Sequence, residues 1–386
     1  MPVINRIAAY SDEMKEWRQH IHQNPELGFD CHNTAAFVIE RLKEFGVDEI
    51  HDGIATSGVV AIINGQGPGD TIGLRTDMDA LPIQEVRDLP YKSKIEGKMH
   101  ACGHDGHTTM LLGAAKYLSE TRNFSGRVAL IFQPAEEGFG GGRVMCEEGI
   151  MTQFGIAQVF AIHNWPGLET GAIAGRTGPI MAAADRFTLT VTGKGGHAAM
   201  PQASIDPIVV ATQIVQAYQT IVSRNTSPFD RAVVSITQFH AGDAFNVIPD
   251  TVEITGTVRT FKPEVQEMVE LRMSEIATHM AAAHGATAEL NYMGGYPATV
   301  NHGAQLEFAA DVARDLVGKD MVDTDVVPSM GGEDFAYMLQ ERPGAYLFLG
   351  QGDSPGLHHS EYDFKDEIAP IGASFFAKLV ETAQPL

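Results

Sequence analysis

The stretch VALIFQPAEE, residues 128–137, decides the fold class of this chain. It opens with a continuous apolar run, a pattern typical of a strand that is buried on both faces of a sheet. A proline then interrupts the run, and the paired carboxylates Glu136 and Glu137 follow it. The stretch therefore predicts a buried strand whose carboxyl end carries two acidic side chains.

Two further apolar runs lead to polar side chains in the same way. Residues 71–74 precede Asp77 and Asp79, and residues 159–162 lead directly to His163. In open α/β sheets, ligands bind beyond the carboxyl ends of the parallel strands. We therefore expect these side chains to meet the glutamate pair at one edge of one sheet.

Helical and strand-like segments alternate through residues 1–183 and resume after residue 297, which predicts an α/β fold with a mixed sheet between helices. Residues 184–296 follow the order β-α-β-β-α-β instead, which is typical of a ferredoxin-like α+β domain. The predicted catalytic domain is therefore discontinuous, with residues 1–183 and 297–386 on either side of an inserted domain, residues 184–296. In the first part we expect helices at 11–22, 33–45, 106–121 and 143–151, and strands at 57–64, 70–76, 127–132, 158–162 and 171–175.

The composition is that of a globular protein with an acidic surface. The 386 residues are 44% hydrophobic and carry a formal net charge of −22. This charge argues against nucleic-acid and anionic-membrane partners, and no run approaches the roughly 20 apolar residues of a membrane span. Three cysteines make a disulfide framework unexpected, and no N-terminal segment reads as a secretion signal, so we expect a cytoplasmic protein.

The segment MHACGHDGH, residues 99–107, brings one thiol and three imidazoles together. Thiolate and neutral imidazole are the usual protein ligands of zinc-like ions. Taken alone, Cys102 is most simply a buried small hydrophobic residue, and the glutamate pair a solvated one. Because each candidate lies where a strand or helix meets a loop, a metal centre with an adjacent acid/base group explains them together.

Four other segments carry candidate functional side chains. Residues 193–201 form a glycine-rich turn around His197 that lacks the ending of a phosphate-binding loop. The segment LHHS, residues 357–360, supplies a further imidazole for a metal. Asn246, before Val-Ile-Pro, and Gly332, before Glu-Asp-Phe, are weaker candidates for contacts with a substrate.

In this combination and order, the motifs resemble the metal-dependent N-acyl-amino-acid amidohydrolases of the hippurate hydrolase, aminoacylase and indole-3-acetyl-amino-acid hydrolase type. This family is related to the glutamate carboxypeptidases, and the chain looks most like its hippurate hydrolase branch. The resemblance covers nearly the whole chain and rests on HQNPELG (22–28), RTDMDALP (75–82) and the segments 99–107, 133–138, 193–201, 245–249 and 329–335.

The resemblance implies a zinc-peptidase-like catalytic domain and a ferredoxin-like insertion that acts as lid and dimerisation domain. It implies two divalent ions per subunit, manganese, zinc, cobalt or nickel, and cleavage of an N-acyl amino acid to a carboxylic acid and a free amino acid. Glu136 would be the general base, and Asp79 would orient a metal-ligating side chain. The metal ligands would be Cys102, His104, Glu137, His163 and His359. His359 is preferred to His358 because the family has a single histidine before the serine.

The lid is expected to contribute the remaining contacts. His197 would stabilise the tetrahedral oxyanion, and its loop of small residues is expected to reach the partner's site in a homodimer. Arg259 and Asn246 would bind the substrate's α-carboxylate, since arginine can hold a carboxylate through two parallel hydrogen bonds. Gly332 is a third candidate for substrate binding. The alternatives to these roles are purely structural. Arg259 would form a surface ion pair, and His197 would be a turn residue without a function.

Two other functions fit parts of the pattern. A thiol hydrolase would use Cys102 as nucleophile and a nearby histidine as base, but the glutamate pair would then be unexplained. A non-catalytic metal-binding protein on the same fold would be marked by the loss of Glu136, which is present. Metal-dependent amide hydrolysis accounts for all of these residues and is our prediction.

Overall fold

The computed structural model describes residues 2–386 and divides into two compact units. The first contains the chain up to Ile180 together with Thr299–Val327 and Asp334–Leu386, and the second contains Met181–Ala298 and Pro328–Glu333. The second unit takes in the short segment 328–333, which the sequence pattern assigned to the catalytic domain. The segment joins it because the N–H of Ala182 donates to the main-chain oxygens of Ser329 and Gly331.

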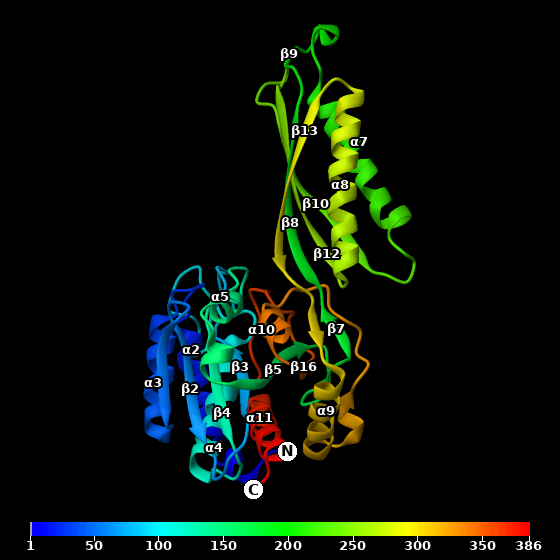
Figure 1. Ribbon diagram of the computed structural model, residues 1–386. Coiled ribbons are helices and arrows are strands. Elements are labelled where there is room, and N and C mark those ends of the chain that lie inside the picture. The colour runs from blue at the N-terminus through cyan, green and yellow to red at the C-terminus, as the bar shows by residue number, and fades with distance from the viewer. Residues whose placement is uncertain (1) are drawn as a thin grey trace. The chain divides into compact units, whose positions relative to one another are not determined.

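The first unit is built on an eight-stranded mixed sheet with the order β1-β2-β4-β3-β5-β16-β6-β15 (Figure 1). The central strands β4, β3, β5 and β16 run parallel, and β1 and β2 add antiparallel strands at one edge. Its strands are β1 (Glu49–Ile54), β2 (Gly58–Asn64), β3 (Thr71–Asp77), β4 (Arg127–Gln133), β5 (Ile156–Pro166), β6 (Ile173–Ala174), β15 (Val322–Asp323) and β16 (Gly344–Gly352). A separate small sheet pairs β7 (Gly178–Met181) with β14 (Thr299–Asn301).

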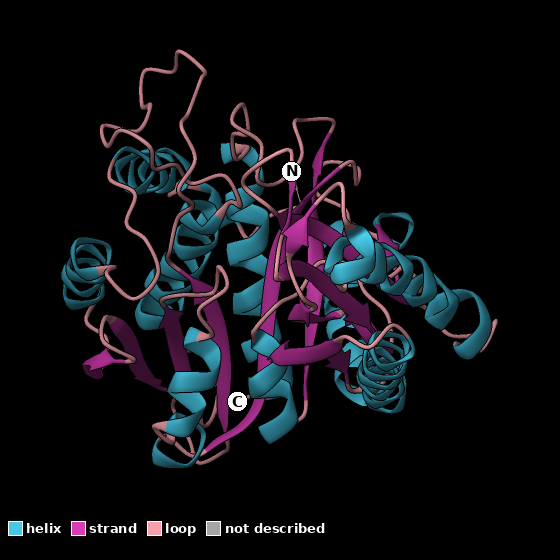
Figure 2. Ribbon diagram, turned by 90° about the horizontal axis from the view of Figure 1, so that it is seen from above, coloured by secondary structure: helices cyan, strands magenta, loops and turns pink. Residues whose placement is uncertain are grey.

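Helices cover both faces of this sheet, as Figure 2 shows in cyan on either side of the long magenta strands. The helices are α1 (Asn5–Ala8), α2 (Ser11–Gln23), α3 (His32–Phe45), α4 (His104–Thr121), α5 (Gly141–Glu147), α6 (Ile150–Gln153), α9 (Gly303–Val317), α10 (Phe335–Glu341) and α11 (Ala369–Ala383). On one face α4 packs against α2, α3 and α11, and elsewhere α5 packs against α10. The α/β fold with a mixed sheet between helices is therefore confirmed.

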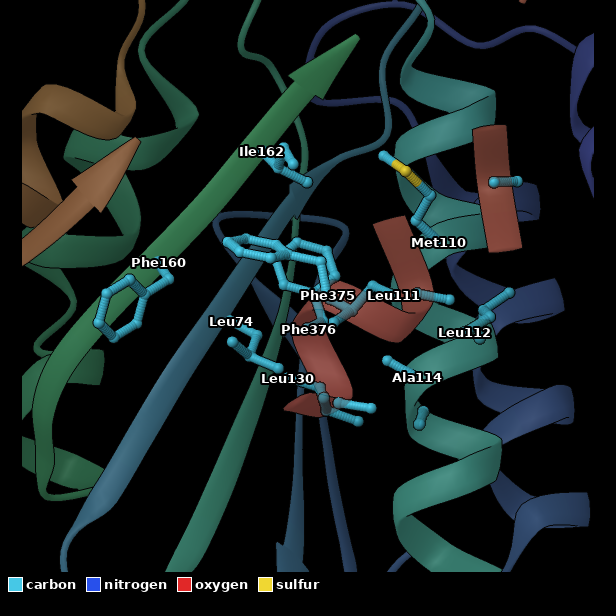
Figure 3. Close-up of a cluster of buried hydrophobic side chains, with 14 of the residues drawn as sticks. Leu74, Met110, Leu111, Leu112, Ala114, Leu130, Phe160, Ile162, Phe375 and Phe376 are labelled. Atoms are coloured by element: carbon cyan, nitrogen blue, oxygen red, sulfur yellow. The ribbon is translucent and has the colours of Figure 1, made fainter. Parts of the chain in front are cut away.

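The central strands read as continuous apolar runs because both of their faces are buried. Val128, Leu130 and Phe132 of β4 belong to the core that includes α4 and α11, whereas the intervening Ala129 and Ile131 are buried outside it. This alternation follows the two-residue period of a strand. Figure 3 shows the same core, with strand side chains such as Leu130 on the side of α4 and α11.

The second unit is a four-stranded antiparallel sheet with the order β10-β12-β8-β13 and two helices (Figure 1). The chain forms β8 (Ala183–Thr192), α7 (Pro207–Thr220), β10 (Ala232–Ala241), β12 (Thr251–Thr260), α8 (Pro263–Ala283) and β13 (Thr287–Tyr296). Apolar side chains from both helices and the sheet form one core. This β-α-β-β-α-β unit has the ferredoxin-like order. A short ribbon of β9 (Gly196–His197) and β11 (Val247–Ile248) extends it.

Within residues 2–386, no helix combines the length and the apolar character that crossing a membrane requires. The three cysteines, at 31, 102 and 146, are buried and carry free thiols.

Candidate metal centre

Polar side chains from separate segments meet at the carboxyl edge of the parallel strands, as the strand-end pattern predicted. The Asp79 carboxylate, two residues beyond β3, accepts hydrogen bonds from the N–H groups of Glu136 and Glu137, at 2.9 and 3.1 Å. The main-chain oxygen of Asp79 accepts from His104 Nδ1 at 2.7 Å. His163 lies inside β5, which continues to Pro166, so the expected strand end at this residue is wrong.

One group of donors consists of Cys102, His104 and His163, whose ligand atoms lie within 4.8 Å of one another. Cys102 Sγ is 3.4 Å from His163 Nε2. His163 Nδ1 donates to the main-chain oxygen of Asn164 at 2.7 Å, just as His104 Nδ1 donates to that of Asp79. Each bond places the proton of the neutral ring on Nδ1, so that Nε2 is the nitrogen that can bind a metal. His104 Nε2 is buried and has no hydrogen-bond partner in the described chain, which fits a metal ligand.

A second group shares Cys102 and adds Glu137 and His358. Glu137 Oε1 lies 3.3 Å from His358 Nε2 and 3.9 Å from His104 Nε2. This oxygen is buried and has no hydrogen-bond partner among residues 2–386. The two groups together offer donors for two cations, with the thiol common to both, and their chemistry suits zinc-like ions.

The structure places His358, and not the expected His359, beside Glu137. His359 is exposed, and its Nδ1 accepts a hydrogen bond from the N–H of Glu361 at 3.1 Å. The physical reason is a local turn, because His358 has a φ of 63°. In this left-handed conformation the chain direction changes between the two histidines, and the order of residues in the motif cannot predict which ring faces the cluster.

Asp79 contacts three residues of the cluster, and its predicted role in orienting a metal ligand stays a prediction. It is buried, and its carboxylate fixes the main chain of both glutamates while its carbonyl fixes the His104 ring. Glu136 is also buried, and a carboxylate oxygen of it lies within 4.8 Å of ligand atoms of His104 and Glu137. The two neighbouring glutamates can therefore serve different purposes, one at the cations and one at the reacting water.

The electrostatics of the site favour a bound cation. Burial raises the pKa of the Cys102 thiol well above its ordinary value, and the charges of Glu137 and Glu136 raise it further. Burial opposes a charge on His104, but the neighbouring carboxylates, Asp77 first, raise its pKa to about 10. Metal binding would release the proton of the Cys102 thiol and one proton of the His104 ring. These surroundings disfavour Cys102 as a free nucleophile, because a reactive thiolate needs electropositive neighbours.

A buried ionic network supports the edge of the sheet, and the sequence pattern did not predict it. Arg75 donates to Asp77 at 2.7 Å, to Gln133 at 2.9 Å and to Asp334 at 2.8 Å. Gln133 also donates to Asp334, at 2.8 Å. The alternation of Arg75 and Asp77 along β3 is a signal for this pairing, but Asp334 is 259 residues away in the chain.

The third imidazole of the 99–107 segment, His107, has a supporting role. Its Nδ1 lies 2.6 Å from Asp77 Oδ1, and its Nε2 lies 2.7 Å from Asn164 Oδ1. Gly103 lets the chain turn between Cys102 and His104, with a φ of 98°. A Cβ at Gly103 would lie 2.1 Å from Asn164 Oδ1, so only glycine fits there.

The remaining predicted residues, His197, Asn246, Arg259 and Gly332, all belong to the second unit. His197 lies in β9 and Asn246 directly precedes β11, and the N–H of Ala198 donates to the main-chain oxygen of Asn246 at 3.1 Å. Gly332 is packed tightly, because a Cβ there would lie 2.8 Å from Ala184 Cβ. Their contribution to substrate binding and catalysis stays a prediction.

Comparison with known proteins identifies the family. The model of peptidase family M20/M25/M40 matches residues 73–382. The chain belongs to this family. It is 42% identical to hippurate hydrolase of Campylobacter jejuni, over 98% of both chains, and 40% identical to N-acetylcysteine deacetylase of Bacillus subtilis, over 96% of this chain and 97% of that one.

A solved structure that is similar to this chain supports the assignment of a two-metal site. It is a Bacillus subtilis protein described as a dinuclear metal-binding peptidase from the M20 family. The two chains are 36% identical and superpose with a TM-score of 0.86, covering 98% of this chain and 99% of the other.

Proposed function

We propose that this chain is a binuclear metal-dependent hydrolase that cleaves the amide bond of N-acyl amino acids to a carboxylic acid and a free amino acid. The observation that carries the proposal is the pair of donor groups that share Cys102, with the Glu136 carboxylate beside them. The hippurate hydrolase and N-acetylcysteine deacetylase relatives support this substrate class.

In the proposed reaction, each carboxylate at the sheet edge has a different function. Held by the two donor groups, two divalent ions, manganese, zinc, cobalt or nickel, would polarise the scissile carbonyl and lower the pKa of a water. Glu136 takes the proton of the attacking water and delivers it to the leaving amine. Asp79 keeps Glu136 and Glu137 in position through their main-chain N–H groups.

A substrate screen tests the proposal. Purified protein is supplied with each of the four metals and with N-benzoyl and N-acetyl amino acids, and release of the free amino acid is measured. We expect turnover that a chelator abolishes and added metal restores. Turnover that survives removal of all divalent ions would favour the thiol hydrolase, and no turnover of any N-acyl amino acid would refute the proposed activity.

Arg259 is proposed to bind the substrate's α-carboxylate, together with Asn246. The guanidinium is half-buried and bonds only to Thr257 and to the Val258 oxygen, with no carboxylate within 4 Å in the part of the chain described. Arg259→Gln is therefore expected to lower kcat/KM for an N-acyl amino acid by roughly 10- to 100-fold, the worth of a charge-assisted hydrogen bond. Its effect on the corresponding carboxamide should be small. Equal wild-type rates for acid and carboxamide would contradict the assignment.

His197 is proposed to act in the partner's site of a homodimer formed through the second unit. The residue is exposed on its ribbon, between Gly196 and Ala198, so little steric bulk opposes its approach to another subunit. The homodimer stays a prediction, and so does the cytoplasmic location.

Mixing inactive subunits tests this assignment. Glu136→Gln and His197→Ala chains should each be inactive alone. Random exchange makes about half of the dimers mixed, and each mixed dimer has one intact site of two, so about a quarter of wild-type activity should return. Subunit exchange that is confirmed by mass, but restores no activity, would show that His197 serves its own chain.

A further inference from the structure

The motif HQNPELG, residues 22–28, enters no step of the proposed reaction. Its glutamate has a structural explanation, because the Glu26 carboxylate accepts from the N–H groups of Asn33 and Thr34 at the start of α3, at 3.1 and 2.8 Å. The main-chain oxygen of Glu26 accepts from Ala80. His22, near the end of α2, has no part in this cap and needs a separate explanation.

His22 is fully buried between two carboxylates. Its Nδ1 lies 2.8 Å from Asp105 Oδ2, and its Nε2 lies 3.4 Å from Glu85 Oε1. Burial opposes a charge on the ring, but the hydrogen bonds to Asp105 and Glu85 raise the pKa of His22 to about 9. At neutral pH the ring is therefore a cation that donates from both nitrogens.

The two carboxylates flank the segment that carries the metal donors. Asp105 follows His104 in the first turn of α4. Glu85 lies in the loop that leads to Met99, and its second oxygen accepts from the N–H of Ser93 at 2.7 Å. His22 therefore connects α2 to the chain on both sides of Cys102.

Two neighbouring groups do not replace this connection. Arg18 lies 3.7 Å from Asp105 but is nearer to Asp366, at 2.7 Å. His100 is buried, and neither of its ring nitrogens has a hydrogen-bond partner in residues 2–386. His22 makes the shortest contact of a cationic side chain with Asp105.

We propose that His22 is a positioning residue, which holds Asp105 and Glu85 and thereby keeps Cys102 and His104 in the arrangement that a metal ion needs. The inference rests on the proposed metal-dependent function and adds a specific determinant of metal affinity to it. Residues that bond a metal ligand directly typically change metal affinity by 10- to 100-fold when they are replaced, and His22, which acts through Asp105 and Glu85, is expected at the lower end of this range.

The test compares His22→Gln with His20→Gln, the same change at an exposed position of the same helix. Glutamine can donate to only one of the two carboxylates and carries no charge. Glu85→Gln is the second variant, because it removes the negative charge at the other end of the connection while His22 keeps its contact with Asp105. Apparent Mn²⁺ affinity is measured at 25 °C by competition with a chelator, alongside the Tm, kcat and KM.

We expect roughly tenfold weaker Mn²⁺ binding for His22→Gln and a smaller loss for Glu85→Gln, with kcat and KM restored at saturating Mn²⁺. His20→Gln should match the wild type. A lower Tm with unchanged Mn²⁺ affinity in both variants would show that His22 stabilises the fold only, and would overturn the inference. Wild-type protein that binds none of manganese, zinc, cobalt and nickel would instead refute the proposed function, on which the inference rests.

Discussion

Glu136→Gln is expected to lower kcat by at least ~100-fold while both metal ions stay bound. The amide keeps the shape of the side chain but cannot accept the proton of the attacking water. Glu136 is buried next to the donor groups, where its carboxylate lies beside the predicted metal ions. The main-chain hydrogen bond from Glu136 to Asp79 does not depend on the side chain and should survive.

Bound metal and turnover are measured on the same preparation, with Glu137→Gln as the matched control. The control changes the neighbouring glutamate in the same way, but Glu137 faces His358 and His104 as a donor, so it should lose metal as well as activity. Near-normal turnover of Glu136→Gln would show that it is not the base, and Asp79 or Asp105 would then be the next candidates.

His358→Ala is expected to lose one metal ion per subunit and at least ~100-fold of the turnover, whereas His359→Ala should behave like the wild type. Replacing a residue that bonds a metal ligand typically lowers metal affinity or activity by 10- to 100-fold. Replacing the ligand itself is expected to lower them further. The two replaced histidines are adjacent in sequence, and both are exposed. A difference in metal content or turnover between the two variants therefore reports directly on the position of each ring.

The measurement is metal content by mass spectrometry together with the rate of N-acyl amino acid hydrolysis. The reverse result, with metal loss in His359→Ala only, would restore the ligand that the motif order indicated. It would also show that the turn at His358, with its positive φ, does not place that ring at the cluster.

The central sheet and its active edge could be predicted because they depend on local patterns. The runs at 71–74 and 128–132 form the parallel pair β3 and β4, and the acidic residues beyond them meet through the Asp79 hydrogen bonds. By contrast, β1 was not predicted, because its sequence EIHDGI lies at the sheet edge and is largely exposed. None of its six residues is fully buried, so burial imposes no apolar pattern on this strand.

The details of the site depend on contacts that no local pattern records. The Arg75–Asp334 ion pair joins residues that are 259 positions apart in the chain. His107 fits the motif as well as His104 does, yet Asp77 and Asn164 occupy its two nitrogens. Residue type indicates which side chains are candidates for the metal centre, and tertiary contacts decide which of them remain available to a metal.

Titration of metal-free protein with Mn²⁺ tests the central claim most directly. Bound metal per subunit and hydrolysis of an N-acyl amino acid are followed on the same samples as Mn²⁺ is added back after chelation. The proposed centre predicts no turnover without metal and full turnover once two ions per subunit are bound. Full turnover by protein shown to contain no divalent ion would contradict it.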